Sequence, residues 1–177
     1  DSSGQLSLMQ GLKKNVKAIS TGDVSLHDLV YYVVRGGWPQ SIGVSRNLAE
    51  HLPSEYLNSV IKEDLIKVDG VKRNTRKVEA LLHSLARNEC TIASNSTLIK
   101  DMVDLDKENI DAKTIADYIN ALDLLFLLDN VPSFNPNLRS SRRFLKADKR
   151  HFVDTSLAVA AMGATPEMLI KDLETFG

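Results

Sequence analysis

The densest cluster of chemically active side chains is basic and lies in the last third of the sequence. Six cations fall within twelve residues, opposed by Asp148 alone. They are Arg139, Arg142, Arg143, Lys146, Lys149 and Arg150. On an exposed hairpin such residues neutralise phosphates, with an affinity that depends on salt but not on base sequence. The cluster is therefore a candidate nucleic-acid-binding segment. The alternatives are a solvated loop and a patch that docks on an acidic neighbouring domain.

The stretch 101–129 just before this cluster is acidic. Its acids are Asp101, Asp104, Asp106, Glu108, Asp111, Asp117, Asp123 and Asp129. Only Lys107 and Lys113 oppose them. A helix that reads DNA normally offers Arg, Lys, Asn or Gln to the base edges. Base readout through this stretch is therefore not expected, and its charge favours docking to another protein.

The motif RGGWP at residues 35–39 allows two interpretations. Arg35 could sense the charge of a nucleotide phosphate from a lid helix, because arginine pairs well with phosphate oxygens. Alternatively, the two glycines end a helix and Trp38 packs against the next element. We favour the second interpretation and keep Arg35 as a candidate nucleotide-sensing residue.

Metal and acid–base chemistry have little support in the spacing of the residues. The four histidines show no short ligand pattern, and Cys90 is the only cysteine, so neither a zinc site nor a disulfide is expected. Asp148, His151 and Asp154 lie three residues apart, but on a strand their side chains would alternate between faces. Asp154 suits a helix cap. We predict no catalytic residue, and an idle or packed Cys90.

The elements that would position these residues are mainly helical. Apolar periodicity and capping residues predict helices at 25–34, 45–68, 75–88, 95–103, 111–122 and 156–162, and a last one from 165. Ser25, Asp111 and Thr165 are the expected caps, and Pro53 suits a first helical turn. The apolar run 125–134 and the segment 150–154 are predicted strands. Three helices followed by a two-stranded hairpin is the order of a winged helix.

Composition places limits on the class of protein. Hydrophobic residues make up 43% of the 177 residues, which is enough for a substantial core, and the net charge is −1. No strong global attraction to nucleic acid or to an anionic membrane follows from that charge. With one cysteine, no signal peptide and no apolar run of about 20 residues, the sequence predicts a cytoplasmic protein without membrane contact.

The polar stretch 69–75 divides the chain into two predicted parts. Residues 1–70 would form a helical, lid-like subdomain. Residues 71–177 would form a winged-helix-like domain with a small β-hairpin and C-terminal helices. The predicted fold class is therefore mainly α.

Several motifs in this order resemble the C-terminal half of a family of predicted prokaryotic AAA-type ATPases. They are RGGWP (35–39), the helix with Tyr56, Leu57 and Asp64, LLHSLARN (81–88), TIADYINALDLLFLLDNVPSF (114–134), FVDTSLAVAAMG (152–163) and LIKDLETFG (169–177). In that family a nucleotide-binding domain precedes lid helices and a winged-helix domain of unknown function. The resemblance implies that this chain is a segment of a longer ATPase.

The sequence lacks the GxxxxGK[ST] loop that would hold the phosphates of ATP. We therefore expect a non-catalytic coupling and docking segment without a cofactor of its own, ATP and Mg²⁺ being implied for the parent protein. Its expected partners are the parent's ATPase domain, DNA through the wing, and another protein through the acidic helix face. The alternative is a free-standing winged-helix DNA-binding transcription regulator.

Overall fold

The structure is a computed structural model that describes residues 24–132 and 148–172, and helices dominate it, as the sequence predicted. The α-helices are α2 (Leu26–Arg35), α3 (Arg46–Ser59), α4 (Leu65–Asp69), α5 (Thr75–Arg87), α6 (Asn95–Asp101), α7 (Ala112–Leu124), α8 (Thr155–Met162) and α9 (Pro166–Lys171). The shorter turns are η1 (Pro39–Ser41), η2 (Val60–Asp64) and η3 (Met102–Asp106), of which η2 and η3 are π-helical.

The predicted capping residues begin three of these helices. The Ser25 hydroxyl accepts the N–H of Asp28, the Asp111 carboxylate accepts those of Lys113 and Thr114, and Thr165 caps α9. Each cap supplies an acceptor for N–H groups that have no partner within the helix. These three predictions are confirmed.

The segment from α3 to α4 is one continuous helical rod, Arg46–Asp69, that contains the π-helical turn η2. The expectation that Pro53 begins a helix is wrong, because Pro53 is buried inside α3 and Ser45 is the N-cap. The cap explains the difference, since the Ser45 hydroxyl accepts the N–H of Leu48 and starts the helix two turns earlier. The rod ends at Gly70, which adopts a left-handed conformation.

The predicted strands are not formed as strands within the described ranges. Two isolated antiparallel bridges join Leu128 to Phe152 and Val131 to Lys149. Backbone hydrogen bonds of 2.8–3.0 Å connect the same two segments over 127–131 and 149–153. The β-hairpin of a winged helix therefore stays a prediction, and the residues that would connect its strands, 133–147, lie outside the described residues.

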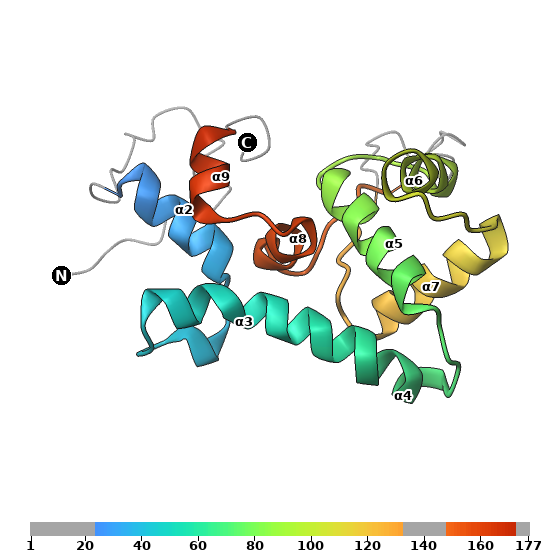
Figure 1. Cartoon of the computed structure of the whole chain (residues 1–177), viewed down its shortest axis with the longest axis horizontal. Coiled ribbons are helices and arrows are strands. Elements are labelled where there is room, and N and C mark those ends of the chain that lie inside the picture. Colours follow the sequence, from blue (N-terminus) through green and yellow to red (C-terminus); the bar gives the residue numbers. More distant parts are fainter. Residues whose placement is uncertain (1–23, 133–147, 173–177) are drawn as a thin grey trace, which may run out of the picture.

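Helix α8 lies between two groups of helices, with α2 and α9 on one side and α5, α6 and α7 on the other (Figure 1). The larger buried cluster runs from Leu57 to Ala161 and includes the apolar faces of α5 and α7. A smaller cluster brings together Val30 and Val34 of α2 with Val159 of α8 and Leu169 of α9. Residues from both sides of the predicted boundary at residue 70 thus share buried contacts. The proposed division into two domains remains a prediction.

Candidate functional site

The RGGWP motif lies directly against the first turn of α8. The Gly37 N–H donates to the Asp154 carboxylate across 2.8 Å, and the Trp38 indole N–H donates to the Ser156 hydroxyl across 2.9 Å. Asp154 also accepts the N–H of Ser156 across 2.9 Å, so one carboxylate caps α8 and holds the end of α2. The Trp38 ring packs on Tyr56, with 4.8 Å between ring centroids. The predicted packing role of Trp38 and capping role of Asp154 are confirmed. We call these contacts the α2–α8 junction.

Gly36 makes the close approach at the α2–α8 junction feasible. Its φ is +70° and its ψ is −170°, a region that L side chains rarely adopt, and it ends α2. A Cβ placed there would lie 2.3 Å from Ser156 Oγ and 2.5 Å from Asp154 Oδ1. Burial raises the pKa of the Asp154 carboxyl, but hydrogen bonds from Ser156 and Gly37 outweigh burial and hold that pKa below its usual value. The carboxylate is therefore charged at neutral pH, as capping requires.

Arg35 is the last residue of α2 and is half-buried. Its guanidinium lies 5.9 Å from the ring centroid of Tyr31 and 5.7 Å from that of Tyr32. Its Nε–H is buried and has no hydrogen-bond partner in the described part of the chain. The neighbouring Arg46 instead pairs with Asp28 across 2.7 Å and stacks on Tyr31. Arg35 is thus a cation without a carboxylate partner in the described residues, on an aromatic surface.

The two described residues of the basic cluster have different environments. The Lys149 side chain is exposed. The Arg150 guanidinium donates to the Ala93 carbonyl across 3.2 Å and to the Asn95 side chain across 2.8 Å, so it fixes the loop before α6. Arg139, Arg142, Arg143 and Lys146 lie outside the described residues. Among the described members of the cluster, only Lys149 is placed to meet a phosphate.

Part of the acidic stretch is used in internal ion pairs. Arg87 of α5 donates to Asp101 across 2.8 Å and pairs with Asp106, which His83 also contacts across 3.0 Å. Asp101 and Asp106 thus hold α6 and η3 against α5, a role that the sequence pattern alone did not reveal. Asp111 has a different internal role, as the predicted N-cap of α7.

The solvent face of α7 remains acidic. Lys113, Asp117, Asn120 and Asp123 are exposed along it, with Leu124 at its end. Asp117 contacts the buried Arg73 across 3.2 Å. One lysine against two aspartates gives a surface that repels phosphates and attracts basic partners.

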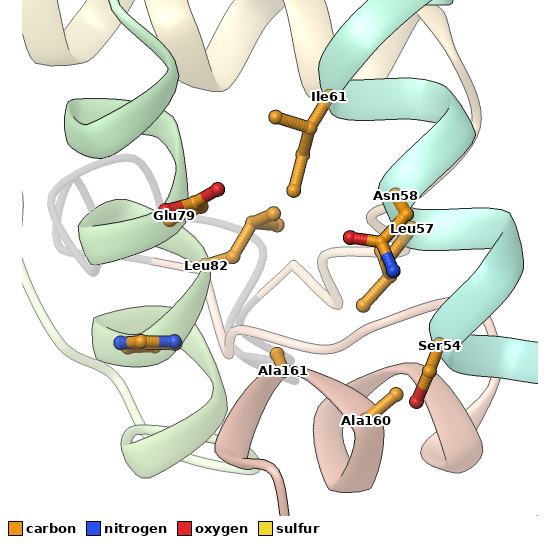
Figure 2. Close-up of a pocket in the computed structure, with 9 residues that line it drawn as sticks. Ser54, Leu57, Asn58, Ile61, Glu79, Leu82, Ala160 and Ala161 are labelled. Atoms are coloured by element: carbon orange, nitrogen blue, oxygen red, sulfur yellow. The ribbon is translucent and has the colours of Figure 1, made fainter. Parts of the chain in front are cut away.

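A small cavity of about 190 Å³ opens between α3, α5 and α8 (Figure 2). Leu57, Ile61 and Leu82 point into it from facing helices, and Ala160 of α8 lies at its base. Its polar lining residues are Ser54, Asn58, Glu79 and His83. Small-molecule sites usually enclose about 300–1,000 Å³, so this cavity suits a single side chain better than a nucleotide.

The structure brings together one set of residues that the sequence did not connect. Glu89, Cys90 and His151 place one donor atom each within 4.8 Å of one another. Asp148 and Asp154, which lie three residues from His151 in the sequence, are not part of this set, as the sequence led us to expect. Asp148 is exposed, and Asp154 belongs to the α2–α8 junction. His151 joins the adjacent Glu89 and Cys90 only through contacts across about 60 residues, so no local spacing could have revealed the set.

Comparisons with known proteins give one match. The model of the family described as "Domain of unknown function (DUF8612)" matches residues 26–168. The chain belongs to this family. No curated protein and no solved structure matches it. Within the described residues, the helices are too short or too polar to cross a bilayer.

Proposed function

We propose that this member of the DUF8612 family is a non-catalytic coupling and docking segment of an AAA-type ATPase. The observation that carries the proposal is the α2–α8 junction. It connects the helix that bears Arg35 to the centre of the described fold through the side chains of Trp38, Asp154 and Ser156. A change in the position of α2 would therefore move α8 as well.

Helix α8 also packs in the same buried cluster as the elements that carry the predicted docking surfaces. Helix α8 packs on α5 through the larger buried cluster, and its N-terminal residues continue from the segment paired with 127–131. Well-packed elements move as units, since their interfaces have few voids to absorb a shift. A nucleotide-dependent displacement at Arg35 would thus reach α5, α7 and the paired segments 127–131 and 149–153.

Helix α2 offers a surface for the neighbouring ATPase domain. Its Val30 and Val34 are buried against the rest of the fold, whereas Leu26, Leu29 and Tyr32 are exposed on another side. Exposed apolar side chains that lie together favour contact with another protein surface. Arg35 lies beside this surface and, without a carboxylate partner in the described residues, is suited to meet a nucleotide phosphate.

The second half is proposed to be winged-helix-like, with the two strands of the wing in the paired segments 127–131 and 149–153. The antiparallel bridges at Leu128 and Val131 support this proposal. The acidic face of α7, which would be the recognition helix, favours a basic protein partner over base readout. The cavity between α3, α5 and α8 suits one anchoring side chain of such a partner.

The test uses the full-length protein that contains this chain. The proposal requires a GxxxxGK[ST] loop upstream of this chain in the full-length sequence. A full-length sequence without that loop would contradict the proposal. Arg35→Ala should then lower the affinity for a fluorescent ATP analogue on the order of tenfold more than it lowers the affinity for the matching ADP analogue. That factor corresponds to the usual free energy of a charge-assisted hydrogen bond. Lys62→Ala, which removes an exposed cation on η2, is the matched control. Equal effects of both substitutions would contradict nucleotide sensing by Arg35.

The alternative function is a free-standing winged-helix DNA-binding regulator, which the basic cluster 139–150 favours. Fluorescence anisotropy of a labelled random duplex, measured at low and moderate salt, distinguishes the DNA-binding regulator from the docking segment. Salt-sensitive binding that disappears in Arg142→Ala/Arg143→Ala would establish phosphate contact through the wing. Absence of binding at low salt would leave protein docking as the supported function.

A further inference from the structure

Glu89, Cys90 and His151 form a compact set of donors where the end of α5 meets the segment before α8. The His151 Nδ1 lies 3.0 Å from Glu89 Oε1 and 3.5 Å from Cys90 Sγ, and Sγ lies 4.0 Å from the same Oε1. These are three chemically different side chains, each with a lone pair directed at one small region. All three distances are short enough for the atoms to share one ion.

The triangle of donor atoms matches the face of a metal tetrahedron. Zinc bonds of about 2.3 Å to sulfur and about 2.0–2.2 Å to nitrogen and oxygen place tetrahedral ligands roughly 3.4–3.6 Å apart. The observed separations of 3.0, 3.5 and 4.0 Å bracket that range. Shifts of a few tenths of an ångström would bring all three to the ideal values.

The backbone holds the two segments in place for this arrangement. The Cys90 N–H donates to the Arg150 carbonyl across 2.9 Å, and the Arg150 N–H donates to the Thr91 carbonyl across 2.7 Å. Cys90 itself has a φ of +61°, an uncommon conformation for a residue with a side chain. Backbone hydrogen bonds therefore fix the position of the segment with Cys90 relative to the segment with His151.

The second oxygen of Glu89 has its own partner. Its Oε2 accepts the backbone N–H of Phe152 across 3.1 Å, which orients the carboxylate and leaves Oε1 facing Cys90 and His151. Hydrogen bonds of this kind fix the direction of metal ligands. Burial raises the pKa of the Glu89 carboxyl, with partial compensation by Phe152 and His151. A nearby divalent cation would favour the charged form of that carboxyl.

We propose that Glu89 Oε1, Cys90 Sγ and His151 Nδ1 bind a zinc-type divalent cation. A thiolate, a carboxylate and a neutral imidazole together neutralise the two charges of the ion. Thiolate and imidazole ligands select Zn²⁺ over Mg²⁺ and Ca²⁺, which prefer oxygen. The Cys90 side is exposed, so the fourth position opens to solvent, as in zinc sites that keep a water ligand.

Cobalt gives a direct test, because tetrahedral Co²⁺ has visible bands and a near-ultraviolet charge-transfer band with thiolate. The chain has one cysteine, so a charge-transfer band must come from Cys90. The reduced, tag-free protein is titrated with Co²⁺, and Zn²⁺ is then added as a competitor. The expected result is one Co²⁺ per chain, both sets of bands, and their loss as Zn²⁺ replaces Co²⁺.

Variants identify the three ligands. Cys90→Ser should abolish the charge-transfer band, and Glu89→Gln and His151→Asn should each weaken Co²⁺ binding by more than about tenfold. His51→Asn, which changes an exposed histidine of α3, is the control and should bind like the wild type. Unchanged affinity in His151→Asn, or one Co²⁺ shared between two chains by native mass spectrometry, would overturn the proposal.

A measurement on the wild-type chain tests the proposal even if the variants do not fold. The ¹⁵N resonances of the four histidine rings are followed as Zn²⁺ is added. One ring should show its Nδ1 resonance shift while its Nε2 keeps a proton, as expected for coordination through Nδ1. No change in any ring, or equal changes in several, would overturn the proposal.

Discussion

The indole Nε1 of Trp38 donates to the hydroxyl of Ser156 across 2.9 Å, although 118 residues separate the two in the sequence. Ser156 is fully buried and lies in the first turn of α8. Beside it, Asp154 accepts the N–H of Gly37. The bond between Trp38 and Ser156 joins the loop after α2 to the helix at the centre of the described fold. We therefore expect it to contribute to the free energy of unfolding.

A double-mutant cycle measures that strength. Trp38→Phe removes the donor and keeps most of the ring, and Ser156→Ala removes the acceptor. The coupling free energy in urea denaturation should be about 0.5–1.5 kcal/mol, the usual net value of a hydrogen bond. Trp38→Phe combined with Thr165→Ala, which acts at the separate N-cap of α9, should give additive effects. A coupling near zero for the first pair would show that the bond does not stabilise the fold.

Gly36→Ala should destabilise the protein strongly. Its backbone conformation alone costs a residue with a side chain about 1–3 kcal/mol, and the new Cβ would also collide with Ser156 and Asp154. Gly43→Ala is the matched control, since Gly43 also has a positive φ, of +80°, but open space around it. The midpoint of thermal unfolding should fall clearly further for Gly36→Ala. Equal losses in the two variants would argue against a close junction.

The ion pair between Asp69 and Arg73 should make stability depend on acid pH. The Arg73 guanidinium, whose side chain is only 3% exposed, lowers the pKa of Asp69 from 3.8 to about 2. A depressed folded-state pKa contributes stability above the unfolded value, and this contribution is lost as pH falls from about 4 to about 2.

Urea midpoints at several acid pH values test this expectation. Asp69→Asn should be less stable than the wild type at pH 6, and the difference should shrink as pH approaches 2. Asn120→Ala, at an exposed residue of α7 that carries no titrating group, should give a constant difference instead. A pH-independent difference for Asp69→Asn would contradict the linkage.

Arg150 and Lys149 should separate folding from binding within the basic cluster. Arg150→Ala removes charged hydrogen bonds to Ala93 and Asn95 and should cost about 1.5–3 kcal/mol of unfolding free energy. Lys149→Ala, at an exposed side chain, should change stability by less than about 0.5 kcal/mol. Chemical denaturation checks both values. Loss of DNA binding in Lys149→Ala could therefore be assigned to the contact itself.

Local chemistry made most helix limits predictable. Ser25, Asp111 and Thr165 each carry an oxygen suited to cap a helix, and the chain around them follows the regular apolar period. Pro53 misled, because proline usually stands in the first helical turn, whereas here it lies inside α3 with its ring buried. The helix 75–88 was predicted to within one residue at its end.

Contacts between distant segments were not predictable from one sequence. The aspartates at 101 and 106 looked like a free acidic surface, yet Arg87 pairs with both. Likewise, Cys90 had no evident partner until the segment at His151 came to lie beside it. Periodicity and capping report on neighbours three or four residues away, whereas these pairs depend on how helices pack.

The small cluster of Val30, Val34, Val159 and Leu169 bears on the order in which the protein is made. The apolar partners of α2 on α8 and α9 are translated roughly 125–140 residues after it. Until then its buried face has nothing from those helices to pack against, and helices of this length are marginal alone in water. The nascent chain therefore exposes this face of α2 until α8 and α9 have emerged, so its folding should depend on chaperones more than that of a domain whose core forms from neighbouring segments.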